Sequence, residues 1–299
     1  MTRIGLVGCG RWGANVLRDL VSLGADVVAA DPDPVKRDAA SAAGATASVE
    51  RTEQLPECDG FVVVTPATAH RGVVLEVLRR GTPVFVEKPP CTTLVDVEHL
   101  AAHGDGRLFV MHKWRWHPGI RELARIAASG RLGTPLELRT TRIGPEPLPD
   151  SVDVVWHLGA HDLSIALEVL GNVPPVLRAT GTRDAVGRLT ACEVFMANDT
   201  GKHAMRVGAG ASERSRTVEL RGTDGFAILE RADAGVIVVE TQHGREEVAL
   251  PSTMPLEAEL RDFLAHVEGG PPPRSSADDA VTIARRMTDI QLAIVGPGA

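Results

Sequence analysis

The sequence predicts an α/β protein with two domains, which we place at residues 1–118 and 119–299. Up to about Pro118, apolar strand-like runs alternate with helical runs of roughly ten to thirteen residues, which is typical of a doubly wound parallel sheet covered on both faces. Further on, β-rich runs alternate with turn signals between Pro175 and about Leu250. This second pattern predicts an α/β domain with a large open, mostly antiparallel sheet.

The first domain has clear helix boundaries. Gly24 follows the first helical run as a C-cap residue, and Asp33-Pro34 supplies an N-cap with proline at the first helical position. Gly44 ends that second helix. The predicted strands are residues 3–8, 25–31, 59–65, 82–87 and 107–112, and the predicted helices are residues 13–23, 34–43, 68–80 and 94–103.

The second domain begins with a helix, a strand and another helix, predicted at residues 119–129, 135–143 and 154–170. Two turn signals in the β-rich part lie at residues 198–201 and 222–225. Two closing helices are predicted at residues 255–268 and 277–294, the second capped by Ser276 with Asp279. The last helix is a candidate for packing back on the first domain.

Composition excludes several classes of protein. The net charge is −7 and no basic block occurs, which argues against nucleic acid or anionic membrane as a partner. No run approaches the roughly 20 apolar residues of a membrane span, and no signal peptide precedes the first strand, so we expect a cytoplasmic protein. The cysteines are scattered without a CxxC pair, which argues against a zinc ribbon or a disulfide framework: Cys9, Cys58, Cys91 and Cys192.

A dinucleotide fingerprint follows the first predicted strand. Its residues are Gly8, Cys9, Gly10, Arg11, Trp12 and Gly13. In this context Gly8 makes a tight turn, Gly10 admits the pyrophosphate and Gly13 lets the helix lie against the strand. Asp31 ends the second strand, where its carboxylate can accept hydrogen bonds from a ribose. These residues predict a Rossmann domain that binds the cofactor; the alternative is a structural turn with a surface aspartate.

Asp31 also bears on the choice of cofactor, because a carboxylate there repels a 2′-phosphate. NAD is therefore expected, and NADP stays open because Lys36 and Arg37 lie within a turn of Asp31. Tyrosine is absent from the chain, which excludes the Tyr-x-x-x-Lys mechanism of short-chain dehydrogenases.

Two segments follow strands at the edge where ligands gather in open α/β sheets. They are Thr65-Pro66 and Glu87-Lys88-Pro89-Pro90. A partly shielded lysine beside a nicotinamide ring can take or give the proton of a substrate hydroxyl. Lys88 is the candidate for this role, and a surface lysine after a strand is the alternative.

Together these residues resemble the Gfo/Idh/MocA oxidoreductases, relatives of glucose–fructose oxidoreductase and inositol dehydrogenase. The resemblance is carried by the glycine motif, Thr65-Pro66 with His70, Glu87-Lys88-Pro89 and the β-rich second half. It implies an N-terminal Rossmann domain, a C-terminal domain with a large open sheet, and polyol, sugar or nucleotide-sugar substrates. On this basis the expected cofactor-binding residues include Arg11, Trp12, Thr65, Pro66, His70, Glu87 and Lys88.

The family pattern Asp-x-Gly-x-His in the second domain matches residues 157–161. His161 falls on the proton-handling histidine and Gly159 on the glycine, whereas His157 replaces the aspartate. A second imidazole cannot supply a negative charge, so the proton relay differs here. The spacing of His157 and His161 also suits zinc, but no Glu or third ligand accompanies them. A polar structural role is the other alternative.

The segment at 113–118 links the two predicted domains, where family members line the substrate pocket. Trp114 and Trp116 offer aromatic faces to a sugar ring, and Arg115 could bind a phosphate or carboxylate. Packing at the domain interface is the alternative for both tryptophans.

The sequence thus predicts an NAD(H)-dependent oxidoreductase acting on a sugar, cyclitol or nucleotide sugar, with Lys88 and His161 handling the proton and His157 beside them. Imine reduction or lyase-like chemistry through a transient ketone is one alternative, and a nicotinamide-binding regulatory protein without catalysis is another. A large open sheet with one uncovered face favours a homodimer or homotetramer.

Overall fold

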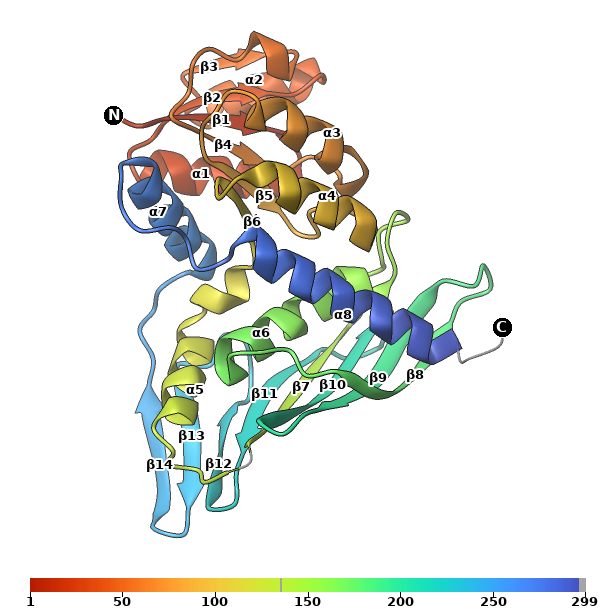
Figure 1. Cartoon of the computed structure of the whole chain (residues 1–299). Helices are drawn as coiled ribbons and strands as arrows, with labels where there is room; N and C mark the ends of the chain where they lie inside the picture. Colours follow the sequence, from red (N-terminus) through yellow and green to blue (C-terminus); the bar gives the residue numbers. More distant parts are fainter. Residues whose placement is uncertain (135, 296–299) are drawn as a thin grey trace. The chain divides into compact units, whose positions relative to one another are not determined.

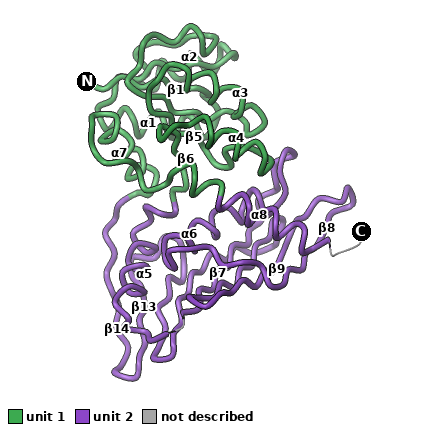
Figure 2. Tube along the Cα trace, in the orientation of Figure 1, with its two compact units in different colours: residues 1–113, 254–281 green, residues 114–253, 282–299 purple. Residues whose placement is uncertain are grey.

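The computed structural model describes residues 1–134 and 136–295. The chain forms two compact units (Figure 2). Unit 1 comprises residues 1–113 and 254–281, and unit 2 comprises residues 114–253 together with the chain from residue 282. Each unit is built around one sheet, parallel in unit 1 and mostly antiparallel in unit 2. The predicted fold class is confirmed.

Unit 1 contains a six-stranded parallel sheet in the order β3-β2-β1-β4-β5-β6. The order reverses between β1 and β4, and ligands bind at such a switch point, outside the carboxyl ends of the strands. The strands are β1 (Arg3–Val7), β2 (Asp26–Ala30), β3 (Ala47–Val49), β4 (Gly60–Val63), β5 (Val84–Glu87) and β6 (Leu108–Met111).

Strand β3 was not located from the sequence. It is only three residues long, lies at the sheet edge and has no fully buried residue, so it lacks the apolar run that identifies a buried strand. A short 3-10 helix, η1 (Thr52–Gln54), follows it. The loop between them enters the candidate site described below.

Helices cover both faces of this sheet (Figure 1). The predicted cap of the second helix is confirmed, since the Asp33 carboxylate accepts a hydrogen bond from the Val35 amide at 3.0 Å. The helices are α1 (Arg11–Ser22), α2 (Pro34–Ala42), α3 (Ala67–Leu78), α4 (Leu94–Gly104) and α7 (Pro255–Val267).

Helix α7 comes late in the chain but belongs to unit 1. It lies beside α1, and its Phe263 ring stacks on Phe85 of β5 with 5.1 Å between the ring centroids. Both rings are fully buried. This contact therefore fixes α7 against the strand that leads to Lys88.

Unit 2 contains an eight-stranded sheet in the order β14-β13-β12-β11-β7-β10-β9-β8, in which β7 and β10 pair in parallel and all other pairs are antiparallel. Both predicted turns lie between strands, before β10 and before β12. The strands are β7 (Leu136–Gly144), β8 (Val176–Arg183), β9 (Leu189–Ala197), β10 (Gly201–Ala209), β11 (Ser215–Arg221), β12 (Gly225–Leu229), β13 (Val236–Thr241) and β14 (Gly244–Ala249).

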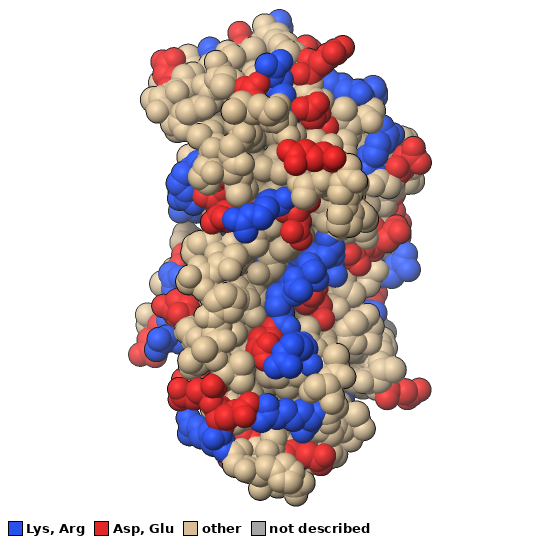
Figure 3. Space-filling view, turned by 90° about the vertical axis from the view of Figure 1, so that its left-hand side faces the viewer, with Lys and Arg blue, Asp and Glu red and all other residues tan. Residues whose placement is uncertain are grey.

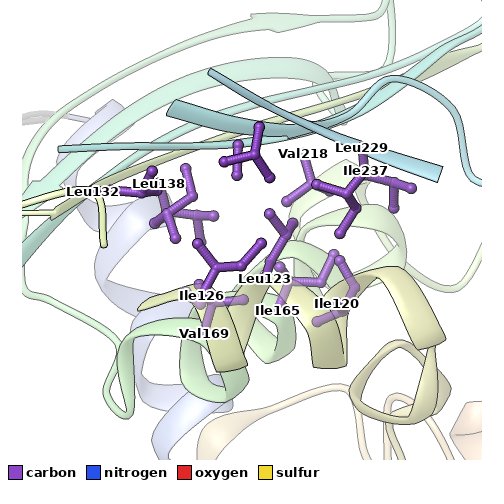
Figure 4. Packing of buried hydrophobic residues seen from close by; sticks show 14 of the residues in the cluster. Ile120, Leu123, Ile126, Leu132, Leu138, Ile165, Val169, Val218, Leu229 and Ile237 are labelled. Atoms are coloured by element: carbon purple, nitrogen blue, oxygen red, sulfur yellow. The ribbon is translucent and has the colours of Figure 1, made fainter. Parts of the chain in front are cut away.

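Two helices, α5 (Pro118–Ala128) and α6 (Ala160–Leu170), cover one face of this sheet and bury its main apolar cluster (Figure 4). Ile120 and Leu123 of α5 meet Ile165 of α6 and the strand residues Val218 and Leu229. A 3-10 helix, η2 (Lys113–Trp116), precedes α5. Helix α8 (Ala277–Val295) carries the predicted cap: the Asp279 amide donates to Ser276 Oγ at 3.1 Å, and the Ser276 amide donates to the Asp279 carboxylate at 3.0 Å.

The helix predicted at residues 154–170 is not uniform. Its first part, η3 (Val155–Gly159), is a π-helix, and only α6 is α-helical. The predicted bounds of the helix are confirmed, and the segment that carries His157 is a π-turn rather than α-helical. A π-turn of this kind often marks a functional site, because it redirects a side chain out of the regular register.

The sheet of unit 2 also carries exposed charged side chains. Arg206 of β10 pairs with Glu193 of β9, and both side chains are exposed. On the face drawn in Figure 3, acidic and basic side chains are interspersed.

The homo-oligomer expected from an open sheet stays a prediction. None of the helices in residues 1–134 and 136–295 is long and apolar enough to cross a membrane.

Candidate cofactor site and candidate catalytic residues

Unit 1 holds a cavity of about 740 Å³ at the switch point of its sheet. Seven residues that the sequence predicts as cofactor-binding line it: Gly8, Gly10, Arg11, Trp12, Asp31, Thr65 and Pro66. The sequence analysis did not find the loop after β3 and the start of η1, which add Glu50, Arg51, Thr52 and Glu53 to the wall. No local signal could have found that loop, since the strand before it is short and exposed.

The three glycines of the fingerprint differ in what surrounds them. Gly8 has a φ of 100°, and a Cβ there would lie 2.9 Å from the backbone of Val64 and Thr65. A Cβ on Gly13 would lie 2.1 Å from the Gly8 carbonyl oxygen, so only glycine lets α1 approach β1. A Cβ on Gly10 would meet nothing within 4 Å. Gly10 therefore leaves open space on the cavity side, where a pyrophosphate needs it.

The amino end of α1 faces this space without a side-chain cap, since Gly10 occupies the N-cap position. The first backbone N–H groups of a helix have no partner within the helix and attract anions, phosphates above all. The open backbone at Gly10 and the uncapped helix end together fit the pyrophosphate of a dinucleotide.

Asp31 is buried directly after β2 and is tied to the glycine loop. Its Oδ2 accepts a hydrogen bond from the Cys9 amide at 2.8 Å, and its Oδ1 accepts one from the Asp33 amide at 3.0 Å. Lys36 Nζ lies 3.9 Å from the same Oδ1. The carboxylate is thus held on the cavity wall, where it can accept further hydrogen bonds from a ribose.

The two basic residues after Asp31 are placed differently. Arg37 donates to the carbonyl oxygens of Asp31 and Pro32 at 2.8 and 2.9 Å, so its guanidinium is engaged with backbone. Lys36 lines the cavity, as does Arg51 from the loop after β3. Lys36, Arg51 and Arg11 are thus cations that share the cavity wall with Asp31.

His70 of α3 lies beneath the cavity rather than in its wall. It is buried, with Nε2 2.7 Å from the Thr65 carbonyl oxygen and Nδ1 3.0 Å from the Pro89 carbonyl oxygen. Burial lowers the pKa of this imidazole, while the two carbonyl contacts oppose the shift. His70 therefore bridges the segments that follow β4 and β5, and it holds Thr65 and Pro89 together.

Lys88 follows β5 directly, and its peptide bond to Pro89 is cis. The Lys88 amide donates to the carboxylate of Glu87. Burial raises the pKa of Glu87, and the nearby Lys88 and Lys113 ammonium groups oppose that shift. Lys113 in turn lies 4.4 Å from the centroid of the Trp12 ring, which belongs to the cavity wall.

Glu259 of α7 is a neighbour that the sequence analysis did not find. It is 1% exposed, and neither carboxylate oxygen has a hydrogen-bond partner in the described part of the chain. Burial and the like charge of Glu87 raise the pKa of Glu259 well above its usual range, and Lys113 opposes the shift weakly. Burial and the charge of Glu87 therefore both favour the neutral, protonated form of Glu259.

In unit 2, the candidate histidines have different environments. His161, at the start of α6, is buried and meets the Trp114 ring edge-on at 6.5 Å between centroids. His157, in the π-turn, is half-buried and lines a small cavity with Arg142 and Arg216. The structure thus separates a histidine packed on an aromatic ring from one that faces two arginines.

Asp153 stands one turn before His157, but its carboxylate is engaged elsewhere. Its Oδ1 accepts hydrogen bonds from the amides of Val155 and Trp156 at 3.0 and 3.1 Å, and its Oδ2 accepts one from Gln291 at 2.6 Å. Asp153 therefore caps the π-turn. It does not take over the role of the aspartate that His157 replaces.

The carboxylate next to His161 in sequence belongs to a buried ion pair. Asp162 Oδ2 lies 2.7 Å from Nε of Arg142 on β7, and both side chains are at most 5% exposed. Burial raises the pKa of Asp162, and Arg142 offsets this by favouring the ionised form. The Arg142 guanidinium also lies 4.3 Å from the Trp114 ring centroid. Arg142, Asp162 and Trp114 thus form the support beneath His161.

The predicted substrate-lining residues of η2 are mostly engaged within unit 2. Trp114 and Trp116 are buried, and Trp114 belongs to the apolar cluster under α5. Arg115 donates to Glu168 at 3.0 Å, with both side chains about 10% exposed. This placement favours packing over sugar binding for the tryptophans. Within residues 1–134 and 136–295, no three His, Cys, Asp or Glu side chains gather as metal ligands.

Residues 2–107 match the model of an oxidoreductase family described as having an NAD-binding Rossmann fold. Over these residues the chain is similar to the Gfo/Idh/MocA oxidoreductases. The matched region contains the glycine loop, Asp31 and Glu87-Lys88-Pro89. The resemblance drawn from the residues is thereby confirmed.

Curated relatives are dehydrogenases. Inositol 2-dehydrogenase 2 from Saccharopolyspora erythraea is 34% identical over 187 residues, which is 56% of this chain and 54% of that protein. UDP-N-acetylglucosamine 3-dehydrogenase from Acidithiobacillus ferrooxidans is 25% identical over 224 residues, or 70% of each chain. This chain thus matches about half the length of the first of these relatives.

Solved structures share the fold over nearly the whole chain. The structure of UDP-N-acetylglucosamine 3-dehydrogenase from A. ferrooxidans gives a TM-score of 0.87 at 21% identity and covers 98% of this chain and 97% of that one. An oxidoreductase from Agrobacterium radiobacter, in complex with NAD+, L-tartaric acid and magnesium, gives a TM-score of 0.86 at 17% identity, covering 98% and 96%.

Proposed function

We propose that this protein is an NAD(H)-dependent oxidoreductase that moves hydride between a nicotinamide and the carbinol or ketone carbon of a sugar, cyclitol or nucleotide sugar. The observation that carries the proposal is the cavity at the switch point of the sheet. Gly10 leaves room there for a pyrophosphate, and the Asp31 carboxylate can accept hydrogen bonds from a ribose. The names of the curated relatives support the substrate class.

We propose NAD as the preferred cofactor. The buried Asp31 carboxylate is fixed by the Cys9 amide and cannot turn away from a 2′-phosphate, which it would repel. Arg37 is engaged with backbone carbonyls and is not available to neutralise that phosphate. Lys36 and Arg51 line the same cavity, so NADP binding is expected to be weaker rather than absent. Dissociation constants for NADH and NADPH measure the preference.

Proton handling is assigned to Lys88 and His161. When bound, the nicotinamide cofactor supplies the carbon that accepts or gives the hydride. The hydroxyl oxygen of the substrate must then lose or gain a proton, which a lysine or histidine within hydrogen-bond reach can take or give. Glu87 holds the Lys88 backbone, and the pair of Arg142 and Asp162 supports the helix that presents His161.

The experiment measures steady-state turnover of Lys88→Ala and His161→Ala beside their NADH dissociation constants, with polyols, keto-sugars and nucleotide sugars as substrates. General acid–base groups contribute about 10²–10⁴-fold, so turnover falls by that factor while NADH affinity stays nearly constant. His157→Ala costs less. Two exposed residues of unit 2, Lys202 and His243, serve as alanine controls with unchanged rates.

Other outcomes contradict the proposal. Reduction of imines but not of ketones would assign the scaffold to imine chemistry. Tight NADH binding without turnover of any substrate would favour a nicotinamide-binding regulatory protein. A dead His157→Ala variant beside a nearly normal His161→Ala variant would mean that the proton-handling histidine is one turn earlier than assigned.

A further inference from the structure

A small cavity in unit 2 carries more positive than negative charge. It holds about 20 Å³ and lies between the ends of β7 and β10, the start of β11 and the π-turn η3. The side chains that matter for its charge are Arg142, Glu146, His157 and Arg216. A space of this size admits one or two oxygen atoms of a ligand rather than a whole sugar.

The charges around this cavity do not cancel. Arg142 is paired with Asp162 at 2.7 Å, and Glu146 is paired with the exposed Arg214. Arg216 is half-buried, and its guanidinium makes no ion pair or hydrogen bond with any residue that the structure describes. Each of these two ion pairs is neutral in itself. The guanidinium of Arg216 is therefore the one charge at this cavity without a partner of opposite charge among the described residues.

The environment of Arg216 is unfavourable for an isolated cation. Burial lowers the pKa of its guanidinium, and the neighbouring Arg142 and Arg214 lower it further, against the weaker effect of Glu146 and Asp162. An arginine stays charged all the same, so this position costs free energy in the ligand-free protein. A polar group held at such a cost often serves to bind a ligand of opposite charge.

His157 contributes no negative charge to this cavity. The family pattern has an aspartate here, which would neutralise Arg216, whereas this chain has an imidazole on the cavity wall. The replacement removes a negative charge from a cavity that already has positive charge in excess. A neutral polyol has no group that benefits from this change, but an acidic ligand does.

We propose that Arg216, with His157 and Arg142, forms a subsite for a carboxylate or phosphate group, so that the substrate is an acidic sugar derivative rather than a neutral polyol. This inference rests on the proposed function, since it places the acidic group one helical turn from His161. The Arg216 guanidinium offers several N–H donors in a plane that matches a carboxylate or phosphate. His157 lines the same cavity, and the buried pair of Arg142 and Asp162 keeps the wall in place.

The first experiment compares pairs of substrates that differ only in an acidic group, with NAD as oxidant. The pairs are D-glucuronate with D-glucose, and D-glucose 6-phosphate with D-glucose, which separate a carboxylate from a phosphate. The ratio of kcat/KM for the acidic member to kcat/KM for the neutral member is expected to exceed about ten. A ratio of this size corresponds to the contribution of one hydrogen bond to a charged group. A ratio at or below one in both pairs overturns the subsite.

Variants test which residues produce this ratio. Arg216→Gln lowers it by about tenfold, because the charge-assisted hydrogen bonds to the acidic group are lost. His157→Asp lowers it further, because the carboxylate repels the acidic group. Arg221→Gln is the matched control, since Arg221 ends the same strand far from the cavity and pairs with Glu219; its ratio stays that of the unmodified protein. Equal losses in Arg221→Gln and Arg216→Gln would overturn the assignment.

A second measurement does not depend on turnover. Because Arg216 is an uncompensated charge, Arg216→Gln raises the melting temperature of the ligand-free protein, and D-glucuronate or inorganic phosphate raises it for the unmodified protein but not for the variant. If no substrate turns over but these shifts occur, the proposed function fails and the subsite stands. If substrates turn over and neither anion shifts the melting temperature, the subsite fails and the proposed function stands.

Discussion

At the scale of single residues, substitutions at Gly10 and Gly13 are expected to have different effects: the first on cofactor binding and the second on the stability of the fold. Replacing Gly10 with Val is expected to abolish NAD binding, since the side chain enters the space left for the pyrophosphate. The fold should persist, because a Cβ at Gly10 meets nothing within 4 Å and the backbone there is extended. Titration of NADH fluorescence together with a melting temperature tests both statements.

Gly13→Ala is the matched comparison. Its Cβ would lie 2.1 Å from the Gly8 carbonyl oxygen, so it lowers the melting temperature. If Gly10→Val binds NADH with unchanged affinity, the cofactor does not approach the protein at this loop. If Gly13→Ala is as stable as the unmodified protein, the close approach of α1 to β1 is not a constraint.

Glu259 gives a prediction about pH. Its pKa in the folded protein is raised above the unfolded value, so the folded state binds more protons between the two values. The free energy of unfolding therefore falls as pH rises above the usual glutamate pKa, until the folded pKa is passed. Glu259→Gln cannot ionise at this position and therefore loses less stability over that range.

The measurement is the melting temperature from pH 5 to pH 8. The unmodified protein is expected to lose more stability over this range than Glu259→Gln. Glu257→Gln is the control, since Glu257 lies on the same helix, is partly exposed and pairs with Arg261 at the surface. Identical pH profiles of Glu259→Gln and the unmodified protein would contradict a protonated Glu259.

Site residues that follow a strand closely in sequence could be predicted, whereas residues brought to the site by a distant element could not. The glycine loop, Asp31 and Thr65-Pro66 follow strands and could be assigned from local order, and they line one cavity. Glu259 could not be found this way, because it meets Glu87 only after α7 has returned to the first sheet. Arg216 could not be found either, since its significance depends on which neighbours are already paired.

At the scale of elements, the ion pair between Arg142 of β7 and Asp162 of α6 joins the sheet of unit 2 to the helix that follows the π-turn. Asp162→Asn leaves a buried guanidinium without its charge partner, and breaking such a pair costs about 3–5 kcal/mol. The free energy of unfolding from denaturant titration measures this loss.

An exposed pair on the same sheet is the control for Asp162. Arg206 and Glu193 are both more than half exposed, and Glu193→Gln is expected to cost about 1 kcal/mol or less. A double variant, Arg142→Met with Asp162→Leu, recovers much of the loss, because no buried charge remains. If Asp162→Asn costs no more than Glu193→Gln, the buried pair does not hold β7 and α6 together.

Most elements follow from periodicity and capping, and the exceptions have physical causes. Asp33, Ser276 and Asp279 make the caps that their positions predict. The π-turn at residues 155–159 was missed because i→i+5 bonding changes neither composition nor apolar periodicity enough to be seen locally. It matters for the site, since His157 lies in this turn and lines a cavity with Arg142 and Arg216.

At the scale of the whole molecule, unit 1 is not one continuous segment, since residues 254–281 complete it. Local patterns could give the order of strands and helices but not this return, which depends on the stacking of Phe263 on Phe85. The predicted fold class required only the alternation of elements and the β-rich second half. Sheet order and pairing then follow the general rules for parallel and antiparallel sheets.

The central claim is hydride transfer between nicotinamide and the carbon of a sugar-like substrate. The measurement that tests it most directly uses the full-length protein with NADH deuterated at the transferring position of the nicotinamide ring and a keto-sugar acceptor, with the alcohol product analysed by mass spectrometry. We expect the product to carry one deuterium on the former carbonyl carbon and the cofactor to be recovered as unlabelled NAD+. Product that forms without the label, or label found only in solvent, would contradict the claim.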